Sequence, residues 1–469
     1  MESKPDHNRE TVKLDRSDEK DYIEFRSEHL IVRVKKAGLG LEVRDGREKL
    51  IFRDSTSAAF AANTINLVRA IQPKEDFLGL GPRTDAKFSA RGMLLESQNP
   101  FLISTTGYGL DYRSAGKFTF DLGKSNSEQA RTTIRGSDRV EYYFYYGPTP
   151  KEIYEERAKL EAAFDYGEEH VNVLSSKRLP GFARRMDKQP NLCLAIAALS
   201  HASISGTRVP AIDLDDYPGE NATALAQVLP MVLRKSWSEA TGLRKRLAPF
   251  LLTYLQEARE RGFPMIHTLP MQYPEDLAGY ERTDEFLMGD EFLVAPFCGS
   301  EKTRTVYFPR GNWTDMRSGK LYPGRKSYSI NGTTGELPWF SRNGAVLPLA
   351  AAVENGPMEM HYFPKLGGEF FIWEPEVDFI SQLHASPALD YYRVESETKI
   401  ARVYEWVLHH VEPVERVHQV DGRAFERVAS LKDLGLNKWY FDADKKELRV
   451  RHQALVDGHE IINIFLAGR

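Results

Sequence analysis

The stretch Ser203–Tyr217, SISGTRVPAIDLDDY, decides how the middle of this 469-residue chain is interpreted. Apolar residues recur at helical spacing before it, from Leu192 to Leu199, and Ser205-Gly206 then signals a turn. The short apolar segment 209–212 that follows is typical of a buried strand. A helix, a glycine turn and a buried strand in this order predict one unit of an α/β barrel.

Three acids stand at the end of this predicted strand, namely Asp213, Asp215 and Asp216. In α/β barrels the ends of the strands carry the chemistry, so these acids are candidate site residues. The alternative is that they cap the following helix and face water.

Composition excludes several classes of function. The net charge of −4 argues against a nucleic-acid-binding protein, which would show a basic patch. No apolar run approaches the roughly 18 residues of a membrane span, and the charged first 20 residues do not form a signal peptide. We therefore expect a cytoplasmic protein without a membrane partner. Cys193 and Cys298 lie in apolar surroundings, offer no disulfide framework or metal spacing, and are each predicted to be a small buried hydrophobe.

The pattern of apolar residues changes along the chain from strand-like to mixed and back to strand-like. Alternating segments separated by Gly, Pro, Ser and Asn come first, and Gly147-Pro148-Thr149-Pro150 ends them. Helical segments follow, of which Thr241–Arg261 is the clearest, with a kink expected at Pro249. Short strand-like segments return after Gly262.

Several longer motifs resemble glycoside hydrolase family 31, the α-glucosidase and α-xylosidase group. These motifs follow one another in the same order as in that family. They are FLGLG with Arg83 (77–83), NPFLISTTGYGLDY (99–112), VEYYFYYGPTPKEI (140–153), Ser205-Gly206 to Asp213 and Tyr217, LRKRLAPFLLTYLQEARERGFPMIHTLPMQYPED (243–276), EFLMGDEFLVAPF (285–297), VYFPRGNWTDMRSGKLYPG (306–324) and PWFSRNGAVLPL (338–349). The resemblance implies an α+β multidomain chain with an N-terminal β-sandwich, a (β/α) barrel and two C-terminal β-sandwiches.

With these boundaries, the expected parts are a loose tail (1–20), a galactose-mutarotase-like β-sandwich (21–147), a truncated (β/α) barrel remnant (148–270), a proximal β-sandwich (271–350) and a distal β domain (351–469). The barrel is expected to be truncated because a (β/α)₈ barrel needs about 250 residues. Only about 100 residues lie between Leu160 and Gly262. At roughly 30 residues per unit, about three units fit.

The family nucleophile is an aspartate in a Trp-x-Asp-Met-Asn motif, and we find no counterpart at a barrel strand. The Trp-Thr-Asp-Met sequence that ends with Met316 lies among turn residues of the proximal sandwich, so Asp315 is only a lookalike. Retaining glycosidases need a second carboxyl as acid/base. The segment LSSKRLPGFARRMDKQPN (174–191) resembles the family's acid/base region and would place that role on Asp187, with Arg184 as the preceding substrate-binding arginine. A solvated aspartate at the start of a helix is the alternative.

The resemblance also implies substrate contacts at Asp213 and at Arg234. The family's histidine after that arginine is Ser236 here, and its two glycines after the aspartate are Asp215 and Asp216. A cation site formed by Asp213, Asp215, Asp216 and Glu220 is conceivable, but acids at this spacing are common, so we predict neither a metal nor a cofactor.

These departures predict a family 31-like protein of carbohydrate metabolism with lost or strongly reduced hydrolysis, that is, a pseudoenzyme. The first alternative is an active α-glucosidase or α-xylosidase with a rebuilt site. The second is a non-catalytic carbohydrate-binding or interaction protein that stacks sugars on aromatic residues such as Trp313, Tyr322, Trp339 and Trp373. Expected partners are α-linked glycans, a second copy of the chain or an intact homologue. The flanking sandwiches or another subunit should cover the open edges of a short barrel sheet.

Overall fold

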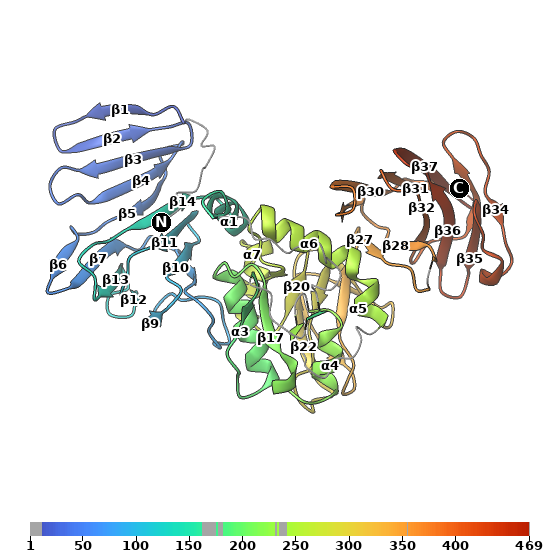
Figure 1. Cartoon of the computed structure of the whole chain (residues 1–469), viewed down its shortest axis with the longest axis horizontal. Helices are drawn as coiled ribbons and strands as arrows, with labels where there is room; N and C mark the ends of the chain where they lie inside the picture. The colour runs from blue at the N-terminus through green and yellow to red at the C-terminus, as the bar shows by residue number, and fades with distance from the viewer. Residues whose placement is uncertain are drawn as a thin grey trace.

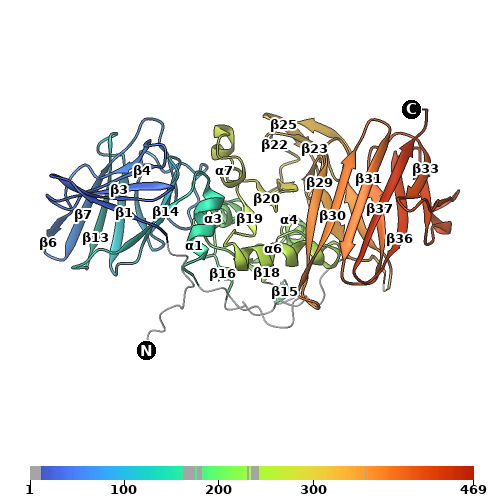
Figure 2. The ribbon, with the colours of Figure 1, turned by 90° about the horizontal axis from the view of Figure 1, so that it is seen from above.

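The computed structural model describes residues 12–161, 175–176, 182–229, 232–233, 242–353 and 355–468. It has three parts in a row: β-sheets at the N-terminal end, a central part with most of the helices, and β-sheets at the C-terminal end (Figures 1 and 2). The predicted fold class, a multidomain α+β chain with β-sandwiches around a truncated barrel, is confirmed. Within the described ranges, no helix is long and apolar enough to cross a membrane.

The N-terminal part consists of three antiparallel sheets around one aromatic-rich core. Strands form here because polar and apolar residues alternate, as in β12, where every second side chain is buried. In order across each sheet, the strands are β1 (Asp15–Asp18), β2 (Tyr22–Arg26), β3 (Leu30–Lys35), β4 (Leu41–Asp45) and β5 (Leu50–Arg53); β14 (Tyr142–Tyr146), β11 (Tyr108–Tyr112), β10 (Phe101–Ser104) and β8 (Phe77–Gly79); and β6 (Ala59–Ala61), β7 (Thr64–Ala70), β13 (Gln129–Arg135), β12 (Lys117–Leu122) and β9 (Leu94–Ser97). Strand β1 falls within residues 1–20, for which a loose tail was expected, and pairs along its whole length with β2.

The helices of the central part are α1 (Pro150–Ala158), α3 (Leu192–Ile204), α4 (Glu220–Ala226), α5 (Gly242–Arg246), α6 (Ala248–Glu260) and α7 (Leu269–Gln272), with the 3-10 turns η1 (Leu214–Asp216) and η2 (Leu277–Glu281). Helix α1 begins with a capping box in which Thr149 and Glu152 exchange hydrogen bonds. The prediction of one kinked helix over residues 241–261 is wrong. Two helices form instead, and Pro249 stands in the first turn of α6, where its missing N–H removes no helical hydrogen bond.

A small parallel sheet runs beside these helices in the order β15 (Ser175–Ser176), β18 (Val232–Leu233), β17 (Pro210–Asp213), β16 (Arg184–Arg185). In register, Arg185 lies opposite Ala211 and Asp213 opposite Leu233. The sheet remains open in the part of the chain that the structure describes, because β15 and β16 each pair with one neighbour only. These four strands are far fewer than the eight of a closed barrel.

Other segments of the chain pack against the C-terminal end of helix α3. Its last residue, Ile204, packs with Phe101 and Ile103 of the N-terminal sheets, and Tyr154 of α1 donates a hydrogen bond to the Ile204 carbonyl at 2.8 Å. Ser205 accepts a hydrogen bond from the Gly81 N–H at 2.9 Å. The flanking sheets therefore cover this end of the helix.

The C-terminal part contains four sheets. The first two, in order across each sheet, are β19 (Ile266–His267), β20 (Phe286–Met288), β21 (Phe292–Val294), β26 (Trp339–Arg342), β23 (Asn312–Asp315) and β24 (Leu321–Pro323), and the pair β22 (Thr303–Phe308) and β25 (Lys326–Asn331). The distal two are β27 (Val346–Leu349), β28 (Met358–Tyr362), β32 (Arg402–Leu408), β36 (Glu447–Ala454), β35 (Lys438–Asp442) and β34 (Glu426–Arg427), and β29 (Gly368–Glu374), β30 (Phe379–Pro387), β31 (Tyr391–Thr398), β37 (Gly458–Leu466) and β33 (Val414–Gln419), with the turn η3 (Leu431–Asp433) between β34 and β35. One hydrophobic core extends from α3 and α6 into the distal sheets, which joins the central and C-terminal parts.

Candidate functional site

The carboxyl ends of β16 and β17 bring together most of the residues singled out from the sequence. Asp213 is the last residue of β17, and Asp187 follows the last residue of β16 by two positions. Because the strands are parallel and adjacent, both acids lie at the same end of the sheet. Asp213 also begins the turn η1, since its Oδ1 accepts a hydrogen bond from the Asp215 N–H at 3.1 Å.

Arg185 is the residue that organises this strand end. Its Nη2 lies 3.2 Å from Oδ2 of Asp213 and 3.1 Å from Oδ2 of Asp216. Lys188 Nζ lies 3.4 Å from the other carboxylate oxygen of Asp216. Asp213 is 9% exposed, so its carboxylate is largely withdrawn from water and is held by a cation. No pattern in the sequence points directly to this pairing, although two arginines, Arg184 and Arg185, stand side by side in β16.

Asp187, the acid/base candidate, is exposed, and so is Arg184. In the residues that the structure describes, the Asp187 carboxylate has no ion pair, and only its backbone carbonyl accepts a hydrogen bond, from Gln189 Nε2 at 3.0 Å. Arg184 donates its backbone N–H to the Val209 carbonyl at 3.0 Å. Neither side chain is enclosed as a catalytic group in a water-excluding site would be.

A cavity of about 430 Å³ opens beside this strand end, between the central part and the proximal C-terminal sheet. Its lining includes Asp216, Tyr217, Glu220, Asn191 and Cys298. The Gln189 N–H donates to the Tyr217 hydroxyl at 2.7 Å, which ties the loop after β16 to the loop after β17. The cavity is large enough for a small ligand.

Asn221, at the start of α4, also lines this cavity and is held by two hydrogen bonds. Its Nδ2 donates to the Gly299 carbonyl at 2.7 Å, and its Oδ1 accepts from the Gly335 N–H at 2.8 Å. Both partners belong to loops of the proximal C-terminal sheet, so the two parts of the chain are joined by direct hydrogen bonds at the cavity.

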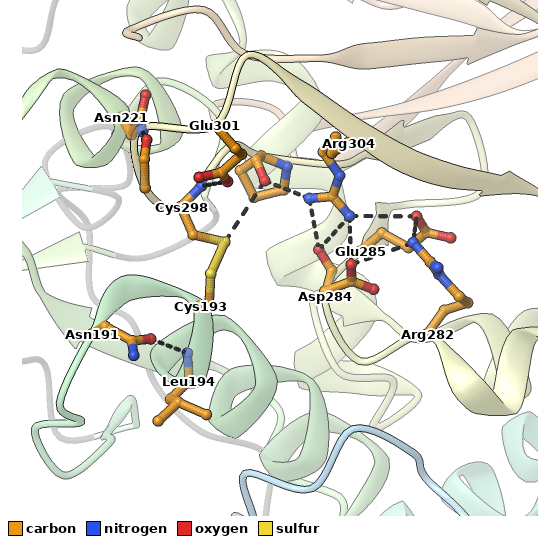
Figure 3. The surroundings of a disulfide bond; sticks show 12 residues. Asn191, Cys193, Leu194, Asn221, Arg282, Asp284, Glu285, Cys298, Glu301 and Arg304 are labelled. Carbon is orange, nitrogen blue, oxygen red and sulfur yellow. Dashed lines mark hydrogen bonds and ion pairs between the residues drawn. A yellow bond between two sulfur atoms is a disulfide. The ribbon is translucent and has the colours of Figure 1, made fainter. Parts of the chain in front are cut away.

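Cys193 and Cys298 form a disulfide next to this cavity (Figure 3). The prediction that each is a separate buried hydrophobe is wrong: Cys193 is exposed and Cys298 is half-buried. Cys193 stands in the first turn of α3, and Cys298 follows β21 in the loop that also carries Glu301. The bond spans 105 residues and crosslinks the central part to the proximal sheet. Two cysteines so far apart give no spacing signal, so only the fold reveals the pair.

Among the candidates that the structure describes, Asp315 does not join this site. Among the described residues, no three His, Cys, Asp or Glu side chains are arranged to hold a metal ion, and Arg185 and Lys188 neutralise two of the four acids considered for a cation. Asp315 lies in the antiparallel strand β23, buried and paired with Arg317 at 2.9 Å. Arg234 and Ser236 lie outside the described residues.

Comparison with known proteins matches part of the chain to one family. The Glycosyl hydrolase family 31 C-terminal domain matches residues 262–347. Over 133 residues the chain is 34% identical to α-glucosidase 2 of Bacillus thermoamyloliquefaciens, and over 121 residues it is 32% identical to the α-glucosidase of Saccharolobus solfataricus. Residues 262–347 thus match the C-terminal domain of glycoside hydrolase family 31, and the resemblance to that family that the sequence motifs indicated is confirmed. These matches take in 27% and 26% of this chain but only 17% of each of the two α-glucosidases.

Solved structures of family 31 proteins share the fold along nearly the whole chain. A dextranase from Flavobacterium johnsoniae superposes with a TM-score of 0.75 at 14% identity, covering 97% of this chain and 92% of its own. The cycloalternan-forming enzyme from Listeria monocytogenes gives 0.77 at 14% identity, with 98% of this chain and 72% of its own covered. An α-xylosidase from Xanthomonas citri gives 0.69 at 10% identity, with 97% and 94% covered. At such identities the likeness concerns the fold alone.

Proposed function

We propose that this chain is a family 31 protein of carbohydrate metabolism that does not hydrolyse α-glycosides, or does so only very slowly. The observation that carries the proposal is the double ion pair of Arg185 with Asp213 and Asp216. Retaining hydrolysis needs two carboxyl groups about 5 Å apart on opposite sides of the bond to be cleaved, one of them free to attack. Here the enclosed strand-end carboxylates are already paired with a cation.

The second support is the environment of Asp187. A general acid works in a site that excludes water and shifts its protonation equilibrium. Asp187 is exposed on a loop after a two-residue strand. The sequence offers no aspartate in the family's nucleophile motif at a barrel strand, so a partner for Asp187 is missing as well.

The test is hydrolysis of p-nitrophenyl α-glucoside and α-xyloside by the purified chain. We expect release of nitrophenol at the rate of buffer alone, unchanged in Asp187→Asn. An intact family 31 α-glucosidase assayed in parallel is the positive control. Turnover that falls at least tenfold in Asp187→Asn would overturn the proposal.

Hydrolysis by a rebuilt site is the second candidate function, and one observation favours it. Asp187 and Asp213 stand at the same end of two adjacent strands, beside a cavity of about 430 Å³. In that case, Asp213→Asn and Asp187→Asn should each abolish turnover of the same nitrophenyl glycosides. A further proposed role is association with an intact homologue, for which co-purification of the two chains is the test.

The disulfide argues against the cytoplasmic location expected from the sequence. Disulfides persist in oxidising compartments and are rare in the reducing cytosol. We propose an oxidising compartment for this protein, and alkylation of free thiols in intact cells distinguishes the two locations.

A further inference from the structure

A second cleft lies away from the strand-end site, between α6, the turn from β20 to β21, and the distal strands β29 and β30. It consists of two adjoining cavities of about 470 and 460 Å³, which share the three lining residues Glu291, Arg342 and Glu369. Neither cavity shares a lining residue with the cavity beside Asp216. Cavities of this size suit a small ligand.

Glu291 lines both cavities of the cleft and is 6% exposed. The Tyr254 hydroxyl donates to its Oε2 at 2.7 Å, and the Asp290 N–H donates to the same oxygen at 3.1 Å. Its Oε1 has no hydrogen-bond partner among the described residues. Burial, reinforced by the nearby Asp290, raises the pKa of Glu291 to about 8. At neutral pH the carboxyl therefore carries its proton and can both donate and accept.

Asp290 does not share this behaviour, although it is the next residue. Lys151 Nζ lies 2.8 Å from its Oδ1, and His267 Nδ1 lies 3.0 Å from the same atom. These partners hold the pKa of Asp290 well below its usual range, against the effect of burial. The Asp290 carboxylate is thus already engaged by Lys151 and His267, and Glu291 remains the group available to a ligand.

One wall of the cleft is apolar. Phe371 and Trp373 stand two residues apart on β29 and so point to the same face of the sheet. Ile380 of β30 lies directly opposite Trp373 in the register. Phe371 is 42% exposed and Ile380 43%, so this surface is open to a ligand. By contrast, Trp313 and Tyr322, two of the aromatic residues considered for sugar stacking, are buried in the proximal core.

The polar groups around this wall carry both signs of charge. Acids Glu257, Glu260 and Glu369 line the cleft together with Arg261 and Arg342. Arg261 already pairs with Glu155 and Glu257. Arg342 Nε and Trp373 Nε1 are buried donors without a partner in the described part of the chain. Arg342 would repel a cationic ligand, and the glutamates would repel an anionic one. An uncharged ligand therefore fits this cleft best.

We propose that this cleft binds a neutral carbohydrate, with the C–H face of one sugar ring on Phe371 and Trp373 and its hydroxyls on Glu291 and Arg342. A sugar combines an apolar face with hydroxyls that both donate and accept hydrogen bonds. These features match the apolar wall of the cleft and the polar groups around it. The site is separate from the strand end and does not depend on whether the chain hydrolyses glycosides.

The experiment is a calorimetric titration of the full chain with methyl α-glucoside, maltose and isomaltose, with glucosamine and glucuronic acid as charged comparators. We expect the neutral sugars to bind and the charged ones to bind at least tenfold more weakly. Phe371→Ala should weaken binding about tenfold, since one stacking surface is lost. Phe60→Ala, which removes an aromatic ring that is 58% exposed on β6, is the matched control and should change nothing.

Three further variants locate the ligand. Glu291→Gln keeps a neutral donor and acceptor and should bind within about twofold of the parent, whereas Glu291→Ala should lose at least tenfold. Trp373→Phe should remove the change in tryptophan fluorescence on binding while calorimetry still detects the sugar. The proposal is overturned if no neutral sugar binds at about 10 mM, if a charged comparator binds more tightly, or if Phe371→Ala binds like the parent.

Discussion

The guanidinium of Arg185 lies 3.2 Å from the carboxylate of Asp213 and 3.1 Å from that of Asp216. This one cation therefore links the end of β16 to the end of β17 and the turn that follows it. Asp213 lies where the family resemblance places a substrate contact, and the paired acids after it replace glycines. Asp216, the second of these two acids, thus supplies a second partner for the arginine.

Arg185→Ala should destabilise the chain by about 1 kcal/mol, because an enclosed carboxylate loses its cation while the arginine itself is half exposed. Lys188→Ala is the matched control. Among the described residues Lys188 pairs with Asp216 alone, and its side chain is 63% exposed, so its loss should cost much less. Urea unfolding followed by circular dichroism measures both, and equal effects would show that Asp213 does not need Arg185.

Reduction of the Cys193–Cys298 disulfide should lower stability by about 2–4 kcal/mol, since the bond closes a long loop in the unfolded chain. The double variant Cys193→Ala/Cys298→Ala should be equally unstable and insensitive to dithiothreitol. Thermal unfolding with and without reductant gives the comparison. Two alkylatable thiols in the purified native chain would contradict the pairing.

The sequence predicted the order of the parts because each part carries its own periodic pattern. Alternation in segments such as β12, the apolar period of α3 and the glycine turn at Ser205-Gly206 are local signals, and local structure followed them. The apolar periodicity continues across Pro249 and therefore predicts one kinked helix, whereas the structure has two. Whether proline kinks a helix or begins one depends on the preceding residues, and Leu247 ends the earlier helical turn.

The site was predicted less well, because its contacts join distant residues. The sequence singled out Asp213 and Asp187, and the structure places both at one end of the sheet. The sequence did not predict that Arg185 forms an ion pair with Asp213, nor that Cys193 forms a disulfide with Cys298, 105 residues away. Both depend on how α3 and the proximal sheet pack. Glu291 lies in a motif that resembles the family, but only the fold shows the cleft above it.

The contribution of Glu291 to stability should fall as pH rises from about 5 to 8. Its pKa is raised to about 8 by burial, so the folded state holds a proton that the unfolded chain releases near pH 4.3–4.5. The stabilisation is complete below the unfolded pKa and is lost as pH rises through the folded one. Asp290, Glu257, Tyr254 and Arg342 face the same group.

Glu291→Gln removes the titrating proton and should flatten this part of the stability profile. Glu369→Gln, at an exposed position of the same cleft, is the control and should leave the slope unchanged. Urea midpoints between pH 5 and 8 provide the measurement. An identical slope in the parent and in Glu291→Gln would show that this carboxyl is ionised in the folded chain.

Ser205→Ala should cost about 1–3 kcal/mol, because it leaves a buried N–H without a partner. The Ser205 hydroxyl accepts from the Gly81 N–H at 2.9 Å and donates to the His201 carbonyl at 2.6 Å, in a fully buried position. Ser203, two residues earlier on the same helix, is also fully buried, but its hydroxyl has no partner in the described chain. Ser203→Ala should therefore be close to neutral. Equal losses in the two variants would show that packing, rather than the hydrogen bond to Gly81, holds α3 against the N-terminal sheets.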